Sequence, residues 1–126
     1  MTGYLLDTHV LLWWLCDPTR LSDEARAVIA DGQNTVYLSA AAAWEMSIKR
    51  ALGRLDMPGN LEEVLRKDLI EVLPIRLPHA LAVADLPLHH RDPFDRMHVA
   101  QARHENLVLI THDEKIAAYD VSVLMT

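Results

Sequence analysis

The sequence predicts an α/β protein, a three-layer α/β/α sandwich with a central, mostly parallel sheet. Short apolar runs rich in β-forming residues alternate with longer segments whose apolar residues recur at helical spacing. Strands separated by helices are typical of βαβ units, in which helices cover both faces of a parallel sheet. The connections are short and the chain has 126 residues, so we expect one domain over residues 1–126.

The first half of the chain contains two predicted strands and three predicted helices. Ser22 is an N-cap candidate, and the acidic residues after it suit the positive end of a helix dipole. Thr8 is expected to cap the first helix, and Gly53 suits the end of the third. The expected strands cover residues 4–6 and 35–38, and the expected helices cover residues 10–15, 23–30 and 40–52.

The second half contains three predicted strands and four predicted helices. Asn60 and Glu63 form a capping-box pattern before the first of these helices, and Pro74 keeps the next strand short. Asp92 is a good N-cap, with Pro93 at the first helical position. The expected strands cover residues 70–75, 107–110 and 121–124, and the expected helices cover residues 64–69, 78–84, 93–104 and 113–118.

Composition excludes several classes of protein. A hydrophobic content of 51% argues against disorder, and a net charge of −6 excludes binding to nucleic acid through an all-over basic surface. The single cysteine, Cys16, excludes an intramolecular disulfide framework and a cysteine-rich zinc site. The apolar run at residues 10–15 is far shorter than the roughly 20 residues of a membrane helix. No signal peptide is apparent, so a cytosolic location is expected.

Four acidic residues are expected at one edge of the sheet. Asp7 follows the first strand directly, and Asp113 comes two residues after the strand segment that ends at Thr111. Asp95 lies in the first turn of a helix, and Glu45 lies near the start of the helix after the second strand. Ligand sites in parallel sheets lie beyond the carboxyl ends of the strands, so these carboxylates can converge there.

Such a cluster indicates a metal site. Four neighbouring carboxylates repel one another unless a cation lies among them, and hard oxygen ligands select Mg²⁺ or Mn²⁺. Such an ion can contact phosphate oxygens and lower the pKa of a bound water molecule. The expected chemistry is therefore metal-assisted hydrolysis of a nucleic-acid backbone, without a nucleophilic side chain.

Each acid also has a structural interpretation. Asp7 and Asp113 are both placed to cap the helices that follow them. Glu45 stands four residues before Lys49, a surface pair worth about 0.2–0.5 kcal/mol. Asp95 suits the first turn of any helix, but it shares a face with apolar residues and is expected to point inward, where it needs a partner.

The histidines are weaker candidates. His9 and His112 each adjoin a candidate acid, so contact with a substrate is one interpretation for both. His98 is expected to serve in packing or at the surface rather than as a ligand. His89 and His90 are adjacent loop residues, which rarely bind the same ion.

Positive charge and aromatic residues complete the candidate list. Arg96, beside Asp95, is expected to hold a substrate phosphate, the alternative being a solvated charged face. The three tryptophans are expected in the core or in a subunit interface rather than as platforms for stacking bases; they are Trp13, Trp14 and Trp44.

Four segments appear in the order seen in a known family. They are residues 5–9 (Leu-Leu-Asp-Thr-His), 39–49 (around Trp-Glu), 90–96 (His-Arg-Asp-Pro-Phe-Asp-Arg) and 109–113 (Leu-Ile-Thr-His-Asp). This order resembles the PIN-domain ribonucleases, specifically the VapC toxins of bacterial type II toxin–antitoxin systems. The resemblance covers essentially the whole chain, and the Asp-Pro-Phe-Asp-Arg stretch is fairly specific to one VapC branch.

The resemblance implies a single PIN domain over residues 1–126 and a Mg²⁺-dependent (or Mn²⁺-dependent) endoribonuclease that cuts tRNA or ribosomal RNA. It further implies a homodimer and an antitoxin protein whose C-terminal segment blocks the site. The residues that match the family's metal-binding and catalytic acids are Asp7, Glu45, Asp95 and Asp113, the last acting partly through water. Ser39 and Thr111 match supporting hydroxyl positions.

Two other functions fit part of the pattern. A haloacid-dehalogenase-like phosphatase also starts with an aspartate after the first strand. It normally has a second aspartate where this chain has His9, and a lysine near the later acids, yet no lysine closely precedes Asp113. A non-catalytic partner-binding domain would explain the unusually apolar first helix, which contains Leu11, Trp13 and Trp14.

Overall fold

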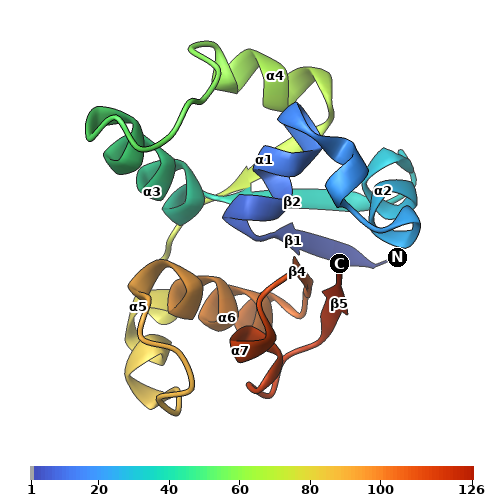
Figure 1. Ribbon diagram of the computed structural model, residues 1–126. Coiled ribbons are helices and arrows are strands. Elements are labelled where there is room, and N and C mark those ends of the chain that lie inside the picture. The colour runs from blue at the N-terminus through green and yellow to red at the C-terminus, as the bar shows by residue number, and fades with distance from the viewer. Residues whose placement is uncertain (1) are drawn as a thin grey trace.

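The sheet has five strands, and helices cover both of its faces. The computed structural model describes residues 2–126, so Met1, the first residue of the expected domain, lies outside the described part. The strand order is β3-β2-β1-β4-β5, and each of the four pairings is parallel. Figure 1 shows α1, α2, α3 and α4 on one side of the sheet and α5, α6 and α7 on the other. The predicted α/β/α sandwich is confirmed.

Each predicted strand and helix overlaps an element of the structure, whereas η1 is not among the predicted elements. The first half contains β1 (Gly3–Leu6), α1 (Thr8–Cys16), the 3-10 helix η1 (Pro18–Arg20), α2 (Asp23–Ala30), β2 (Thr35–Ser39) and α3 (Ala40–Ala51). The second half contains α4 (Leu61–Lys67), β3 (Ile70–Leu73), α5 (Leu77–Ala82), the 3-10 helix η2 (Val83–Asp85), α6 (Pro93–Glu105), β4 (Val108–Thr111), α7 (Glu114–Ala117) and β5 (Val123–Met125).

Side-chain caps begin the helices as predicted at two places. The Ser22 hydroxyl accepts a hydrogen bond from the Ala25 N–H at 3.1 Å, and Asp92 Oδ1 accepts from the Phe94 N–H at 2.8 Å. Each bond satisfies an N–H group that has no partner within its helix. Gly53 follows α3 with a φ of 70°, a conformation that glycine adopts without steric cost.

Two predicted caps are wrong. Thr8 is the first residue of α1 rather than its cap, and its hydroxyl donates instead to Glu45 Oε1 at 2.7 Å. Asn60 precedes α4 but makes no side-chain capping bond, so the expected capping box does not form. The sequence pattern identifies the helix start in both cases, but tertiary contacts decide where the side chain bonds.

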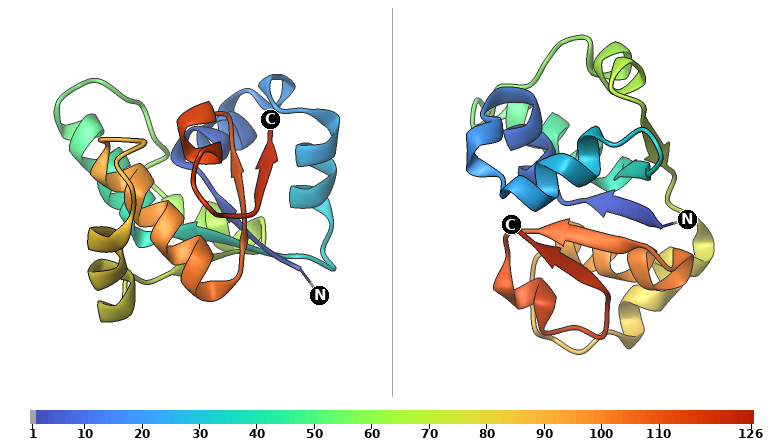
Figure 2. Two further views of the ribbon diagram at one scale, coloured as in Figure 1. Left: turned by 90° about the horizontal axis from the view of Figure 1, so that it is seen from below. Right: turned by 90° about the vertical axis from the view of Figure 1, so that its right-hand side faces the viewer.

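The core has two halves, one on each face of the sheet. Leu6 packs on the face covered by α1 to α4, while its neighbour Leu5 packs on the opposite face with Val99 of α6 and Ile116 of α7. Successive strand residues point to opposite faces, so a sheet covered on both sides needs continuous apolar strands. Both leucines are fully buried, which contributes about 1.5–3 kcal/mol for each side chain. Figure 2 shows the two helical layers from two further directions.

The chain reverses its direction of progress across the sheet between β1 and β4. From β1 it moves outward to β2 and β3, and it then crosses back to β4 and β5. Leu6 pairs with Ile110 at the carboxyl ends of β1 and β4, and the Asp7 N–H donates to the Ile110 carbonyl at 3.0 Å. Such a switch point leaves a crevice outside the strand ends, where ligands bind in open α/β sheets.

The helices within residues 2–126 lack the combination of length and apolar character that crossing a membrane requires.

Candidate metal centre

Asp7 begins the site at the carboxyl end of β1. Its side chain is buried, and Oδ2 accepts a hydrogen bond of 2.7 Å from the Thr111 hydroxyl at the end of β4. The other oxygen, Oδ1, is buried and has no hydrogen-bond partner among the described residues. A buried carboxylate oxygen without a partner is costly, so its position indicates a ligand.

Asp95 approaches the same place from the first turn of α6. Its side chain is 16% exposed, and Oδ2 lies 3.0 Å from His90 Nε2. Burial, together with the negative charges of neighbouring carboxylates, raises the pKa of Asp95 to about 8. These neighbours are Asp7, Asp92, Glu45 and Asp113. The predicted convergence of charge at this edge of the sheet is therefore present.

Asp113 follows β4 and is joined to the site by His90. Its Oδ2 lies 2.7 Å from His90 Nε2, and its Oδ1 accepts from the Lys115 N–H at 2.9 Å, which caps α7. Burial opposes ionisation of Asp113, but the bonds from the Lys115 N–H and His90 hold its pKa below the usual value. The predicted cap at Asp113 is therefore confirmed, and its other oxygen faces His90 and the remaining acids.

His90 was missed by the sequence reasoning as a member of the site. Its Nδ1 accepts the Asp92 N–H at 3.1 Å, which assigns the proton of the neutral ring to Nε2. That N–H is directed at Asp95 and Asp113 together. The only signal for this role in the sequence is the position of His90 two residues before the cap of α6.

Glu45 is buried on α3, but its two oxygens are already engaged. Oε1 accepts from the Thr8 hydroxyl at 2.7 Å, and Oε2 pairs with Lys49 Nζ at 2.7 Å. The hydrogen bond to Glu45 raises the pKa of Lys49. The expected ion pair of Glu45 with Lys49 is therefore present, but the Glu45 carboxylate in it is buried and not at the surface.

The potential metal-binding atoms form two groups at this edge. Oxygens of Asp7 and Asp95 lie with a His98 nitrogen within 4.8 Å of one another, and atoms of His90, Asp95 and Asp113 form a second group of the same size. Among residues 2–126, Glu45 belongs to neither group. Its charge still reaches Asp95, because it contributes to the raised pKa there.

His98 is fully buried on α6, so the surface position, one of the two alternatives expected for it, is wrong. Its Nδ1 lies 3.9 Å from Asp95 Oδ1, which is too long for a hydrogen bond. Neither ring nitrogen has a partner among residues 2–126. Burial lowers the pKa of His98, although the charges of Asp7, Glu45 and Asp92 oppose this. The spacing of three residues from Asp95 is the signal that places it on the same helix face.

The two supporting hydroxyls differ in their contacts. Thr111 Oγ1 donates to Asp7 and also accepts the Asp113 N–H at 3.0 Å, so it links two of the acids. Ser39 caps α3 through the Ala41 N–H and donates to Gln101 Oε1 at 2.5 Å. Thr111 therefore positions the site directly, and Ser39 acts through the packing of α3 against α6.

Arg96 has a different environment from the expected one. Its guanidinium donates to the carbonyls of Val83 at 2.9 Å and Pro87 at 3.0 Å, and to the Tyr119 hydroxyl at 3.2 Å. These bonds tie the loop before α6 to that helix. We therefore assign Arg96 a structural task in place of the expected phosphate contact.

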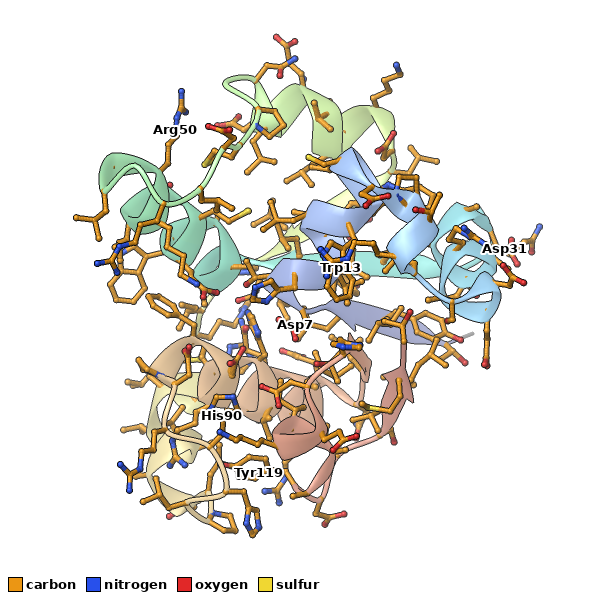
Figure 3. All side chains as sticks on the ribbon, in the orientation of Figure 1. Asp7, Trp13, Asp31, Arg50, His90 and Tyr119 are labelled. Atoms are coloured by element: carbon orange, nitrogen blue, oxygen red, sulfur yellow. The ribbon has the colours of Figure 1, made fainter. Side chains whose placement is uncertain are left out.

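An open concavity of about 610 Å³ lies above Asp7, Asp95 and Asp113. Its other lining residues are His9, Trp13, Arg20, His112, Glu114 and Lys115. Figure 3 shows Asp7 between Trp13 and His90. The two histidines that adjoin candidate acids therefore face the same space as those acids, and two cations lie at its rim.

The tryptophans have different environments. Trp13 is partly buried, with its ring 5.3 Å from that of His112 and under the Arg20 guanidinium at 4.5 Å. Trp14 is also partly buried and packs against the core. Trp44 is 60% exposed, so a place in the core is wrong for it. It meets Phe94 edge to face, with 5.1 Å between the ring centres.

The residues present fit a divalent cation. Carboxylate oxygens and a neutral imidazole are both ligands for such ions. The unpartnered Oδ1 of Asp7 and the raised pKa of Asp95 both indicate negative charge that lacks a counterion. A cation at this place would give Asp7 Oδ1 a partner and would favour the charged form of Asp95.

The fold and the site together define a class of α/β protein with carboxylates gathered at the switch point of a parallel sheet. A family model described as PIN domain matches residues 4–122. This chain belongs to the PIN domain family, as the resemblance predicted.

Similar proteins and similar solved structures carry VapC or VapBC names. Ribonuclease VapC22 of Mycobacterium tuberculosis is 27% identical over 123 residues, which are 94% of this chain and 93% of that protein. Ribonuclease VapC16 of the same organism is 47% identical over 36 residues, which are 29% of this chain but only 26% of that protein. A crystal structure of VapBC2 from Rickettsia felis bound to a promoter DNA fragment has a TM-score of 0.72 at 15% identity, covering 98% of both chains. At that identity the structural likeness supports the fold.

Proposed function

We propose that this PIN-domain protein is a metal-dependent endoribonuclease and the toxin of a type II toxin–antitoxin pair. The observation that carries the proposal is the meeting of Asp7, Asp95 and Asp113 at the switch point, with Asp7 Oδ1 left without a partner. The ribonuclease names of the two relatives support the same activity. The proposed protein is a single PIN domain that acts in the cytosol, where its RNA substrate is found.

The proposed metal ligands are the acids of the site, with Mg²⁺ or Mn²⁺ as the ion. Asp7 and Asp95 would hold it directly, and Glu45 and Asp113 would add negative charge or bind through water. When bound, a divalent cation polarises the scissile phosphate and lowers the pKa of an attacking water molecule. In this assignment the carboxylates hold the ion, and no side chain attacks the phosphate.

The surrounding residues fix the acids in place. Thr111 orients Asp7 through its hydroxyl, and Thr8 with Lys49 holds the carboxylate of Glu45. Arg20 and Lys115 line the concavity and are placed to contact backbone phosphates of RNA. Hydrolysis by water would leave a 5′-phosphate and a 3′-hydroxyl end.

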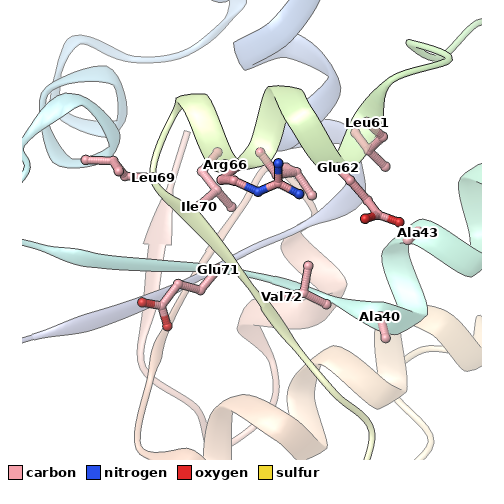
Figure 4. Close-up of a pocket in the computed structure, with 10 residues that line it drawn as sticks. Ala40, Ala43, Leu61, Glu62, Arg66, Leu69, Ile70, Glu71 and Val72 are labelled. Atoms are coloured by element: carbon pink, nitrogen blue, oxygen red, sulfur yellow. The ribbon is translucent and has the colours of Figure 1, made fainter.

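The proposed antitoxin would bind at a second, apolar concavity. This groove, about 660 Å³ in volume, lies between α4 and the edge strand β3 (Figure 4). Its apolar lining includes Leu61, Leu65 and Val72, and Arg66 and Glu71 give it charges that can orient a partner. Because β3 is an edge strand, its outer side also offers unpaired backbone groups to an added segment. We call this surface the β3 groove.

The proposed homodimer would form on exposed apolar side chains of α3. Trp44, Ile48 and Leu52 are exposed and spaced four residues apart, so they form one apolar stripe. Leu77 and Leu81 form a similar exposed pair on α5, which lies on the opposite face of the sheet from α3 (Figure 1). Exposed apolar surface of this kind marks interfaces. We call the Trp44, Ile48 and Leu52 surface the α3 stripe.

Cleavage of RNA by the purified protein tests the proposed activity. Cutting is expected with Mg²⁺ or Mn²⁺, and a chelator should stop it. Asp7→Asn and Asp95→Asn should each abolish cutting without loss of fold, because each removes a negative charge from the metal site and leaves the shape of the side chain. Asp56→Asn, a change at an exposed acid outside the site, should cut as the unmodified protein does.

Two results would count against the assignment. Normal cutting by both site variants would show that these acids do not form the centre. Hydrolysis of small phosphate esters without RNA cutting would favour the phosphatase instead. Sequencing of RNA ends from cells that express the protein would identify the substrate.

A further inference from the structure

His98 is a buried polar side chain on α6 that has no hydrogen-bond partner among residues 2–126. It is fully buried, and neither Nδ1 nor Nε2 makes a hydrogen bond there. Buried side-chain polar atoms nearly always have a partner, and an exception indicates a missing ion, a water molecule or a catalytic role. An apolar residue would fill this position in the core at no such cost.

The geometry places His98 beside two acids of the site. A ring nitrogen lies with oxygens of Asp7 and Asp95 in a group whose atoms are all within 4.8 Å of one another. Asp7 contributes the second unpartnered atom, its buried Oδ1. Asp7 Oδ1, at the end of β1, and the His98 ring, on α6, both lack hydrogen-bond partners among residues 2–126, and both lie next to the same small space.

We infer that His98 is a direct ligand of the metal held by Asp7 and Asp95, which makes the centre a mixed imidazole and carboxylate site that prefers Mn²⁺ to Mg²⁺. The inference rests on the proposed metal site and goes beyond it, because it assigns a nitrogen ligand and a preferred ion. Mg²⁺ binds almost entirely through oxygen, whereas Mn²⁺, a transition-metal ion, accepts an imidazole nitrogen more readily beside its oxygen ligands. A single bound ion would give both Asp7 Oδ1 and the His98 ring a partner.

Electron spin-echo spectroscopy of the Mn²⁺-loaded protein tests the ligand directly. A coordinated imidazole produces ¹⁴N modulation of the Mn²⁺ signal, and carboxylates do not. The modulation is expected in the unmodified protein and should disappear in His98→Leu. His90→Gln is the matched control, since His90 is a second imidazole in direct contact with Asp95 and Asp113. The modulation should persist in that variant.

Titration calorimetry tests the ion preference independently of activity. His98→Leu should lose affinity for Mn²⁺ by at least about 10–100-fold, the loss that follows when a residue supporting a metal ligand is replaced. The affinity for Mg²⁺ should change much less, so the preference for Mn²⁺ should fall. His98→Met offers a second variant of similar volume, because a thioether is a poor ligand for either ion.

The metal-free stability of these variants separates a ligand from a structural histidine. Replacing an unsatisfied buried imidazole with an apolar side chain should leave the metal-free protein at least as stable, as measured by thermal unfolding in a chelator. Mn²⁺ should then raise the unfolding temperature of the unmodified protein more than that of His98→Leu.

Several outcomes would overturn the inference. Mn²⁺ binding that depends on Asp7 but shows no ¹⁴N modulation would remove His98 as a ligand and leave the proposed nuclease centre intact. Modulation lost in His90→Gln and kept in His98→Leu would assign the nitrogen to His90. Absence of any Mn²⁺ or Mg²⁺ binding by the unmodified protein would overturn both this inference and the proposed metal site.

Discussion

At the scale of single residues, the candidate metal centre brings several carboxyl groups together without enough positive charge from the protein to balance them. Asp95 shows this most clearly, because burial and four neighbouring carboxylates raise its pKa to about 8. His90 and His98 also face it, and burial lowers the pKa of His98, which keeps that ring neutral. In the metal-free protein Asp95 therefore carries its proton at neutral pH, and a cation must displace that proton.

The raised pKa of Asp95 predicts that metal-free stability falls as pH rises. The unfolded chain releases this proton near pH 3.8, while the folded protein keeps it until about pH 8. Between these values the unfolded state binds fewer protons, so rising pH favours unfolding, by up to about 1.4 kcal/mol per pH unit. Asn at this position has no proton to release, so Asp95→Asn lacks this fall in the free energy of unfolding. Urea unfolding in a chelator should show the stability of Asp95→Asn gaining on the unmodified protein from about pH 4 to about pH 8.

Comparing the pH dependence of stability in the unmodified protein and in Asp95→Asn separates the effect of Asp95 from that of other titrating groups. The lowered pKa values of His98 and Asp113 act in the opposite direction, since stability that depends on them is lost as pH falls. Both groups are present in the two proteins, so the difference between the two stability curves removes most of their effect. A difference that stays constant over this range would contradict the raised pKa.

At the scale of elements, the ends of strands carry more sequence information about the site than the loops do. Asp7 and Asp113 follow apolar strand segments, and parallel strands must bring those ends to one edge, so their convergence is predictable. Helix periodicity predicts that Asp95 points inward but does not name its neighbour. The contact of His90 depends on the path of the loop before α6, and Arg96 fixes that path through carbonyls far from its own position. No local pattern encodes such contacts.

The structural task of Arg96 predicts a loss of stability rather than of RNA binding. Arg96→Lys keeps the charge but cannot reach the carbonyls of Val83 and Pro87 together, because lysine lacks the guanidinium fork. Losing charge-assisted bonds of this kind should cost about 1.5–3 kcal/mol in urea unfolding. Arg91→Lys, an exposed change in the same loop, should have little effect. If Arg96→Lys leaves stability unchanged but weakens RNA binding, the result would favour the expected contact of Arg96 with a substrate phosphate.

At the scale of the whole molecule, the two apolar surfaces are formed by different exposed side chains and permit separate assemblies, although α3 also contributes Ala40 and Ala43 to the lining of the β3 groove. The α3 stripe is on the outer side of α3, whereas the β3 groove lies between α4 and the sheet edge. The acids at the switch point belong to neither surface. In the proposed assemblies the chain would dimerise through one surface and bind its antitoxin through the other, and the antitoxin's C-terminal segment would extend from there to block the centre between β1 and β4.

This separation predicts that each surface can be disabled alone. Trp44→Glu places a charge in the α3 stripe and should convert a dimer into a monomer, as measured by light scattering after gel filtration. Val72→Glu places the same charge at a similarly exposed apolar position in the β3 groove, where it should leave the dimer intact but weaken binding of the cognate antitoxin. Each variant is the control for the other. Loss of the dimer in Val72→Glu, or a stable dimer in Trp44→Glu, would reverse the assignment of the two surfaces.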